Sequence, residues 1–405
     1  MSYYKLYIWL MIINSFVSLT NKLIPSAIPA GKIVGFLQII VLLIIYSTNL
    51  KKKDILFLFY MFTVDAMILM RMKEAAIDLE NAMFLTSTCL LLWKFSGLKE
   101  RIVLRTEIAS MGKKFFYAAN FLLLIVCVGL VFSSNWVVVN GQRVYFGFGE
   151  SGHKLSGNLC LIGTMYLCYF ENKEIKLMDL LYFLVPFALL SLTGSRTYMA
   201  SYMVILVVFY FKKLRTYKFR QLIMPCLLIG MIYFLLNSSI AQRFFLMGEN
   251  HYISDNFWEA TSSGRLIWWK IDIDSFLNAT LWEKLFGRGF TFLYNLNLRL
   301  YGLKISAHND FITLLLSTGL VGVIGYCIVL KKWLFKTDIE GKIVPTTLAL
   351  VTIMYLWNAM ISGVYGAQQY MNANVFLSLA LLNPVSIRKK RYGERKNDGR
   401  TLSVE

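Results

Sequence analysis

The sequence predicts an all-α protein that crosses a membrane many times. Of its 405 residues, 57% are hydrophobic and only 16% are charged, whereas soluble domains are close to half apolar and a quarter charged. The apolar residues also form uninterrupted blocks of roughly 17–22 residues, the length that a helix needs to cross about 30 Å of hydrocarbon. We therefore expect an all-α polytopic membrane protein with about 12 transmembrane helices.

The apolar blocks define the expected spans. The first block has no small-residue cleavage site behind it and is expected to stay as a span rather than be removed as a signal peptide. The expected ranges are 5–21, 32–50, 54–70, 81–97, 115–133, 155–170, 178–194, 197–211, 220–237, 307–330, 343–361 and 369–384.

The positive charge indicates the orientation of these spans. The net charge is +19, and the basic residues cluster in short segments between blocks, at 51–53, 99–114, 212–220, 331–336 and 386–400. Such segments are cytoplasmic in membrane proteins, so both termini are expected on the cytoplasmic side of an inner membrane. The charge thus reflects topology rather than binding to nucleic acid. We expect one membrane domain, 1–385, and a basic disordered tail, 386–405.

The same orientation places the longest connection, residues 237–306, on the outer face. Connections of this length are usually functional or disordered. This one contains several tryptophans and the amphipathic run RLIWWKIDIDSFL at 265–277. The run predicts a folded loop with short helices, one of which lies along the membrane surface.

Cysteine usage indicates neither a disulfide framework nor a metal site. All six cysteines fall inside apolar blocks and none form a CxxC pair. They are most simply buried small hydrophobic residues, and no metal ligand set is predicted.

Arg196 is the strongest single candidate among the cations. It lies at the outer end of a predicted span, where a charge is costly unless it is paired or functional. Gly194 and Ser195 precede it, and backbone N–H groups at the start of the next helix would form a ready anion site with Ser195. The alternative is that Arg196 extends to the lipid headgroups.

The outer loop adds further cations, although the positive-inside rule disfavours them there. Arg265 and Arg288 each follow a glycine, in SSGRLIWW and LFGRGF, and Arg243 lies upstream. Glycine allows a backbone to approach a ligand closely, and guanidinium binds phosphate oxygens in a forked geometry. Lys270, Lys284 and Arg299 are expected to be solvated surface charges.

His308 begins the apolar stretch 306–326. At 100° per residue, one helical face would carry His308, Ile312, Leu315, Gly319 and Gly322. The two glycines would then let a neighbouring helix pack closely beneath the histidine. A position at a helix N-terminus disfavours protonation, which leaves a neutral imidazole that can act as a base. The alternative is an interfacial histidine with no catalytic role.

The stretch HNDFITLLLSTGLVG resembles the signature of bacterial O-antigen ligases and O-antigen or capsule polymerases. That signature is a histidine, then Asn, Ser or Gln, nine residues, a glycine, two residues, and Gly, Thr or Tyr; it matches at His308, Asn309, Gly319 and Gly322. LTGSRTYMA resembles the family's arginine at an outer span end. Residues 262–290 resemble the start of its large periplasmic loop.

The resemblance implies a glycosyltransferase C-type fold and a metal-independent, inverting transfer without cofactors. The glycan would move from undecaprenyl pyrophosphate to a sugar hydroxyl on the outer face. His308 would be the base, and Arg196 and Arg265 would offset the pyrophosphate charge. Arg288, Arg243, Ser195, Asn309 and Asp310 are candidates for substrate binding. Partners would be the lipid-linked oligosaccharide, the bilayer, a chain-length regulator and a flippase.

The shared signature does not separate a polymerase from a ligase that transfers the glycan to the lipid A core. We favour the polymerase because HND and the basic-acidic loop suit a sugar-lined acceptor. Two other classes remain open. A transporter of lipid-linked sugars would place charges near the membrane midplane, where Asp65 is the main acid. A membrane acyltransferase would also need a His and an Arg.

Overall fold

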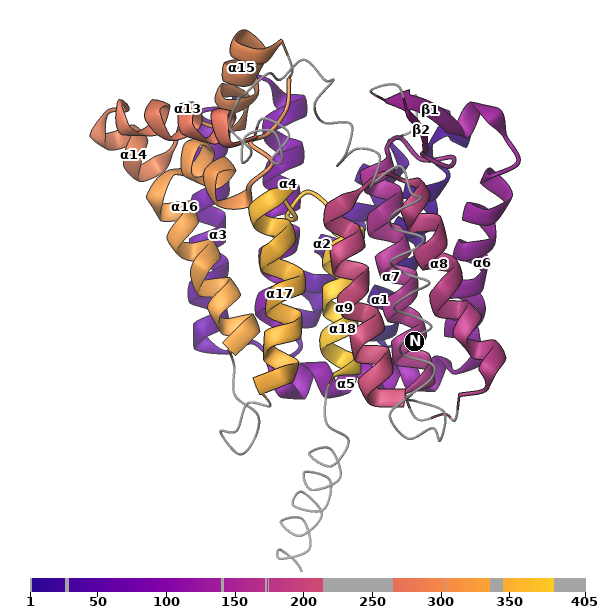
Figure 1. Ribbon diagram of the computed structural model, residues 1–405. Coiled ribbons are helices and arrows are strands. Elements are labelled where there is room, and N and C mark those ends of the chain that lie inside the picture. Colours follow the sequence, from indigo (N-terminus) through magenta and orange to yellow (C-terminus); the bar gives the residue numbers. More distant parts are fainter. Residues whose placement is uncertain are drawn as a thin grey trace, which may run out of the picture.

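The protein is a bundle of helices with three short helices and a two-stranded hairpin at one end (Figure 1). We call this end the α13 end. The computed structural model describes residues 2–25, 29–139, 142–171, 173, 175–213, 265–302, 304–335 and 345–381. The predicted span 220–237, the candidate Arg243 and the predicted tail 386–405 lie outside the described residues.

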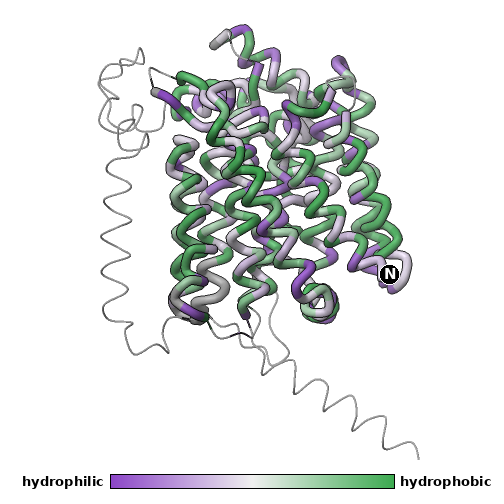
Figure 2. Tube along the Cα trace, turned by 90° about the vertical axis from the view of Figure 1, so that its right-hand side faces the viewer, coloured by the Kyte–Doolittle hydropathy of each residue, from purple (hydrophilic) through white to green (hydrophobic). Residues whose placement is uncertain are grey.

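Two antiparallel helix pairs and a bent pair form the first third of the chain. They are α1 (Tyr3–Leu19), α2 (Ala30–Ser47), α3 (Lys52–Met70), α4 (Ala75–Lys94), α5 (Leu98–Met111) and α6 (Lys113–Gly129). Large apolar side chains stay exposed along α3 and α6, including Phe59, Phe62 and Phe121. Figure 2 shows hydrophobic residues along the length of the bundle. Exposed apolar belts of this kind face lipid in membrane proteins.

The predicted cytoplasmic segment 99–114 is a helix rather than a plain loop. It forms α5 and bends by 82° into α6. The buried residues Leu104, Ile108 and Met111 follow helical spacing and hold one face of α5 against the bundle. Arg101 donates from Nη2 to the carbonyl oxygen of Trp333 at 2.7 Å. The basic residues of this segment indicated a cytoplasmic loop, and the amphipathic pattern was therefore not identified from the sequence.

A short hairpin follows α6. Strands β1 (Trp136–Val139) and β2 (Gln142–Tyr145) pair antiparallel, with Trp136 opposite Tyr145. The Tyr145 hydroxyl donates to the carbonyl oxygen of Val126 in α6. The rings of Trp136 and Tyr145 pack together at the open end of the hairpin, with centroids 5.1 Å apart. The Tyr145 hydrogen bond then holds this end of the hairpin on α6. The sequence analysis predicted no strand here.

The centre of the bundle is α7 (Gly152–Phe170), which packs against α18 (Gln368–Ala380). Almost every residue of α7 is buried. Gly157 and Gly163 permit this, because Tyr370 of α18 and Tyr202 occupy the space beside them. Around this pair stand α8 (Leu181–Leu192), α9 (Arg196–Lys213) and α17 (Pro345–Ile361), and short 3-10 turns occur at Asn21–Leu23, Ser133–Asn135 and Leu177–Leu180.

The described part of the predicted outer loop folds into helices. These are α13 (Arg265–Leu277), α14 (Leu281–Phe286) and α15 (Phe290–Tyr301). The amphipathic run 265–277 is therefore helical, as predicted. Trp268 and Asp272 are its buried residues, and α13 lies against the first part of α16 (Asp310–Phe335).

Helix α16 is broken at Gly319, where the backbone has φ +68° and ψ −167°. A break leaves carbonyl oxygens without helical partners, which is costly in an apolar environment. The turn after α14 supplies them. The N–H of Arg288 donates to the Leu316 carbonyl at 2.8 Å, and the N–H of Gly289 donates to the Ser317 carbonyl at 2.9 Å. The glycine-arginine-glycine turn therefore completes the broken helix.

The break shows that one prediction was wrong, namely that His308, Ile312, Leu315, Gly319 and Gly322 share one helical face. The helix begins at Asp310, after His308, and its periodicity is interrupted at Gly319, so the five residues do not share one continuous face. Gly319 does permit a close approach, but to the backbone of Leu285 and Gly287 rather than to a neighbouring span. A Cβ on Gly322 would meet the Thr318 side chain, within α16 itself.

A helix occupies every expected span range except 220–237, which lies outside the described residues. Within the described ranges, three helices are long and apolar enough to cross a membrane, Ala30–Ser47, Ala75–Lys94 and Asp310–Leu334, and a fourth is counted if α5 and α6 form one bent span. The protein is an all-α membrane protein, and the number of about 12 spans stays a prediction.

We expect Gly319→Ala to be far more destabilising than Gly302→Ala. Both glycines have a positive φ, +68° and +69°. Gly302, with ψ 10°, is in the left-handed helical region, which costs a non-glycine residue about 1–2 kcal/mol, whereas Gly319, with ψ −167°, lies in a region that essentially only glycine adopts. A Cβ at Gly319 would also lie 2.4 Å from the Leu285 carbonyl oxygen, whereas one at Gly302 meets nothing within 4 Å. The check is the thermal midpoint of each purified variant in detergent. Equal midpoints would contradict the clash.

Candidate functional site

His308 lies in a bend between the α13–α15 segment and α16. Its backbone has φ 53°, the single left-handed non-glycine residue of the described chain. Such a conformation is strained and persists only where surrounding contacts impose it. Its ring stacks near Trp268 of α13, with centroids 6.1 Å apart, and it contacts the backbone of Ser362. The histidine is therefore held from both sides.

The residues after His308 supply those contacts. The Asn309 side-chain oxygen accepts from the N–H groups of Phe311 and Ile312 at 2.9 and 3.1 Å, which caps α16. Its Nδ2 donates to the Met360 carbonyl at 3.0 Å. Both ends of this amide are thus occupied by backbone groups. The substrate-binding role predicted for Asn309 stays a prediction, while its contacts show a capping role.

Asp310 is 0% exposed. Its Oδ1 accepts from the Val364 N–H at 2.7 Å, and its Oδ2 accepts from the Tyr326 hydroxyl at 2.8 Å. A buried carboxylate needs such donors. The carboxylate joins the start of α16 to residues 361–367, which connect α17 to α18 and which we call the 361–367 loop. It therefore positions that loop, and the substrate-binding role predicted for Asp310 stays a prediction.

The 361–367 loop also receives Arg265. The Arg265 Nη1 donates to the carbonyl oxygen of Ile361. Burial and the charge of the nearby Arg196 lower the pKa of Arg265 to about 10. This value is far above neutral pH, so Arg265 stays charged. The loop thus holds Arg265 beside the residues that contact His308.

Arg196 is the first residue of α9 and follows Gly194, which has φ +67°. The turn brings Arg196 within electrostatic range of Arg265, because its charge contributes to the lowered Arg265 pKa. Ser195 is 3% exposed, and its hydroxyl lies 3.3 Å from Nδ1 of His153 at the start of α7. Residues from α7, α9 and α13 therefore meet at the His308 bend.

The electrostatics of this group keep the imidazole neutral. Burial first, then the charge of Arg265 and the neighbouring His153, lower the pKa of His308 to about 4. Two like charges side by side are unfavourable unless an anion offsets them. The arrangement therefore combines fixed positive charge with an unprotonated imidazole, which suits an anionic ligand and a base in one place.

His153 is a member of the group that the sequence analysis did not identify. No motif surrounds it, and it is separated from His308 by more than 150 residues in the sequence. Only the packing of α7 against α9 brings it to Ser195. The signal that could have found it is weak: a histidine at the outer end of a predicted span.

Arg288 lies elsewhere at the α13 end. Its Nη2 is 3.2 Å from Glu283 Oε2, and its guanidinium lies over the Phe292 ring at 4.6 Å. The described contacts do not bring it to His308. Its backbone completes α16, as described above. The substrate-binding role predicted for Arg288 stays a prediction, and Arg243 lies outside the described residues.

Asp272 is a second buried acid, about one helical turn after Trp268 on α13. It is 0% exposed on α13, and neither carboxylate oxygen has a hydrogen-bond partner among the described residues. Burial raises its pKa to about 7. In the unfolded chain the carboxyl ionises near pH 3.9. The folded state therefore loses stability as pH rises from about 4 to about 7, and the full penalty remains above that.

We expect Asp272→Asn to raise the thermal midpoint at pH 8, because the amide removes an ionisation penalty of about 4 kcal/mol at most. At pH 5, where Asp272 is protonated, the variant should melt like the wild type. Asp274→Asn, an exposed acid on the same helix, is the matched control and should change neither midpoint. A gain of the same size at both pH values would contradict this assignment.

One family model matches part of the chain. Residues 181–327 match the family model described as O-antigen ligase. The match runs from α8 into α16 and contains Arg196, Arg265 and His308. No curated protein matches the chain. Residues 181–327, about a third of the chain, are therefore similar to the O-antigen ligase family.

Proposed function

We propose that this protein is a polymerase of surface polysaccharide repeat units, of the O-antigen or capsule type. It would transfer the glycan from undecaprenyl pyrophosphate to a sugar hydroxyl of another lipid-linked unit. The observation that carries the proposal is the neutral His308 beside Arg265, which itself neighbours Arg196. The family match supports glycan transfer from a lipid carrier, and the site's chemistry is consistent with it.

In the proposed reaction the oxygen of the acceptor hydroxyl attacks the anomeric carbon of the donor sugar. His308 takes the hydroxyl proton as the new C–O bond forms. The bond between the anomeric carbon and the pyrophosphate oxygen breaks, and undecaprenyl pyrophosphate leaves with the bonding electrons. Attack from the face opposite the leaving group inverts the anomeric centre.

The two arginines fit the leaving group. Negative charge develops on the pyrophosphate as the bond breaks, and fixed cations stabilise it without reorganisation. Bound pyrophosphate in turn offsets the charge of Arg265. This removes one cause of the low His308 pKa, so the imidazole becomes a stronger base once the donor is in place.

The orientation expected from the basic segments supports an active site on the outer face of the inner membrane, with both termini in the cytoplasm. The flippase and the chain-length regulator expected from the resemblance would act before and beside this step. We prefer the polymerase to the ligase on the sequence grounds given above, and the experiment below separates the two.

We expect His308→Ala, Arg265→Ala and Arg196→Ala each to abolish glycan elongation in a strain that lacks the protein. Loss of a base or of a charge-stabilising donor typically reduces kcat by about 10²–10⁴-fold. Glycan chain length on a gel is the measurement, with immunoblots of membranes to confirm the amount of protein. Arg299→Ala, an exposed arginine on α15, is the matched control and should restore normal ladders.

The phenotype of the null strain distinguishes the two activities. Single repeat units on the core, with ladders restored by the wild-type gene, identify a polymerase. Lipid-linked polymer that never reaches the core identifies a ligase instead. Normal-length polysaccharide in the His308→Ala strain would overturn the mechanism for both.

The pH dependence should follow the His308 pKa in each state. For the free enzyme, kcat/KM is expected to be lost only as pH falls through about 4, rather than through the ordinary histidine value of about 6.5. The limb of kcat should lie at higher pH, because bound pyrophosphate raises the pKa. Arg265→Gln should move the kcat/KM limb upward. A wild-type kcat/KM that is lost near pH 6.5 would contradict the lowered pKa of His308.

A further inference from the structure

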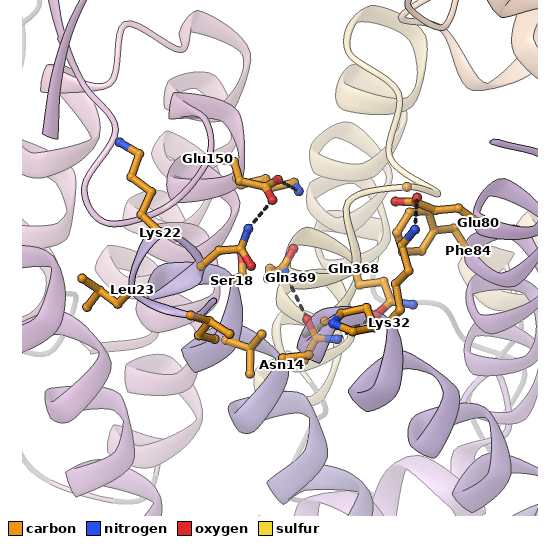
Figure 3. Close-up of a pocket in the computed structure, with 18 of the residues that line it drawn as sticks. Asn14, Ser18, Lys22, Leu23, Lys32, Glu80, Phe84, Glu150, Gln368 and Gln369 are labelled. Atoms are coloured by element: carbon orange, nitrogen blue, oxygen red, sulfur yellow. Dashed lines mark hydrogen bonds and ion pairs between the residues drawn. The ribbon is translucent and has the colours of Figure 1, made fainter. Parts of the chain in front are cut away.

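A cavity of about 810 Å³ opens at the α13 end, away from the His308 bend (Figure 3). Its wall comes from α1, α2, α4, α7 and α18, none of which lies in the matched family segment 181–327. The volume falls within the usual range of small-molecule sites. Side chains on the wall include Asn14, Lys32, Glu80, Phe84 and Gln369.

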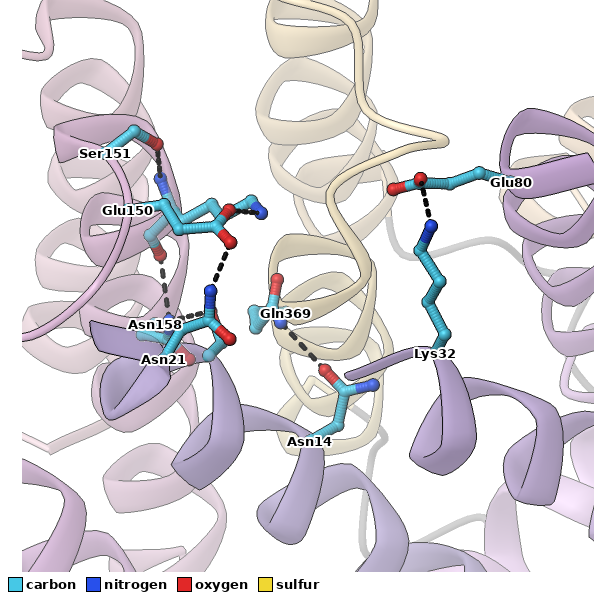
Figure 4. A network of polar contacts seen from close by, with 10 residues as sticks. Asn14, Asn21, Lys32, Glu80, Glu150, Ser151, Asn158 and Gln369 are labelled. Atoms are coloured by element: carbon cyan, nitrogen blue, oxygen red, sulfur yellow. Dashed lines mark hydrogen bonds and ion pairs between the residues drawn. The ribbon is translucent and has the colours of Figure 1, made fainter. Parts of the chain in front are cut away.

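Side-chain amides form one part of the wall. Asn14 Nδ2 donates to the side-chain oxygens of Gln38 and Gln368 at 3.1 and 2.9 Å, and Gln369 Nε2 donates to Asn14 Oδ1 at 2.7 Å. Figure 4 shows the Gln369 carbonyl oxygen pointing away from Asn14. The described chain offers no protein partner to this oxygen or to the Gln368 amino group. One acceptor and one donor are thus left for a ligand.

The charges around the cavity are largely matched. Lys32 Nζ lies 3.0 Å from Glu80 Oε2, which joins α2 to α4. Lys154 pairs with Glu150, which also accepts from Asn21 (Figure 4). Three lysines and two glutamates therefore line the cavity. A pyrophosphate would have to compete with the carboxylates here, whereas at His308 the site carries two arginines. The cavity suits an uncharged ligand with many hydroxyl groups.

Two connections join the cavity to the His308 group. His153 belongs to that group, while the next residue of α7, Lys154, lines the cavity. The 361–367 loop contacts His308 through Ser362 and lines the cavity at Gly366. Four peptide units separate these two residues, so they lie at most about 14 Å apart. A chain of a few sugar rings covers a comparable distance.

From these observations we infer that the cavity binds the uncharged sugar residues of a lipid-linked glycan, next to the ring that reacts at His308. The paired amides and carboxylates would bind hydroxyl groups, and Phe84 would offer an apolar ring face. This inference rests on the proposed function. The saccharide belongs either to the donor or to the acceptor, and the kinetic experiment below separates these sources.

The test uses the purified full-length protein and two probes. The first is the lipid-free repeat-unit oligosaccharide released by mild acid from the host's lipid-linked intermediate, and the second is inorganic pyrophosphate. Gly31→Trp and Gln369→Ala should weaken oligosaccharide binding by about tenfold or more and leave pyrophosphate binding unchanged. Arg265→Ala should have the reverse effect. Calorimetry measures both affinities.

Matched controls exist for both variants. A Cβ at Gly31 meets only Val17 at 4.0 Å, so Gly31→Ala leaves the cavity open, while the tryptophan at this position would fill it. Asn278→Ala removes an exposed amide at the end of α13. Both control variants should bind the oligosaccharide like the wild type, and all variants should keep the wild-type thermal midpoint within a few degrees.

Kinetics with a long-chain donor and a single-repeat acceptor assign the source. A higher KM for the acceptor in Gln369→Ala places the acceptor glycan in the cavity, and a higher KM for the donor places the donor glycan there. Wild-type oligosaccharide affinity in both Gly31→Trp and Gln369→Ala overturns the inference, and so does a wild-type protein that binds no oligosaccharide. The proposed function fails separately, if His308→Ala still makes polymer.

Discussion

The carboxylate of Asp310 is the interaction on which the arrangement of the site depends. It is fully buried and bonds at once to the backbone of Val364 and to the Tyr326 hydroxyl. A buried carboxylate that loses such donors is strongly destabilising. The bond therefore fixes the 361–367 loop to the start of α16. That loop in turn receives Arg265 and contacts His308, so one buried acid helps to set the positions of both residues.

A second constraint is the break in α16 at Gly319. The free carbonyl oxygens of Leu316 and Ser317 accept from the Gly287–Gly289 turn. Because a membrane offers no water to satisfy them, the turn and the helix must form together. This ties α13–α15 to the bundle and keeps α13 over the His308 bend, where Trp268 packs near the imidazole. Glycine at 287, 289 and 319 is needed for the backbone conformation as much as for space.

The distribution of charge supports the proposal that pyrophosphate and the remote sugar residues bind at separate sites. Two neighbouring arginines and a neutral histidine would take the pyrophosphate and the reacting hydroxyl, while matched charges and amides would take the rest of the sugar chain. Separate subsites of this kind let binding energy from remote sugar residues contribute to orientation at the reacting ring. The proposed sites share α7 and the 361–367 loop, so the glycan would be held by the same elements that hold the histidine.

The sequence by itself predicted the apolar helices and the helix at 265–277, and it identified Arg196, Arg265 and His308 as candidates. Apolar blocks of membrane length and an amphipathic run are local patterns, and local patterns predict helices well. Tertiary structure decided what those patterns cannot encode. The break at Gly319 depends on donors from residues 287–289, and His153 reaches the group only through helix packing. The cavity exists because five distant helix ends meet. Each of these depends on partners far away in the chain, and helical periodicity carries no information about them.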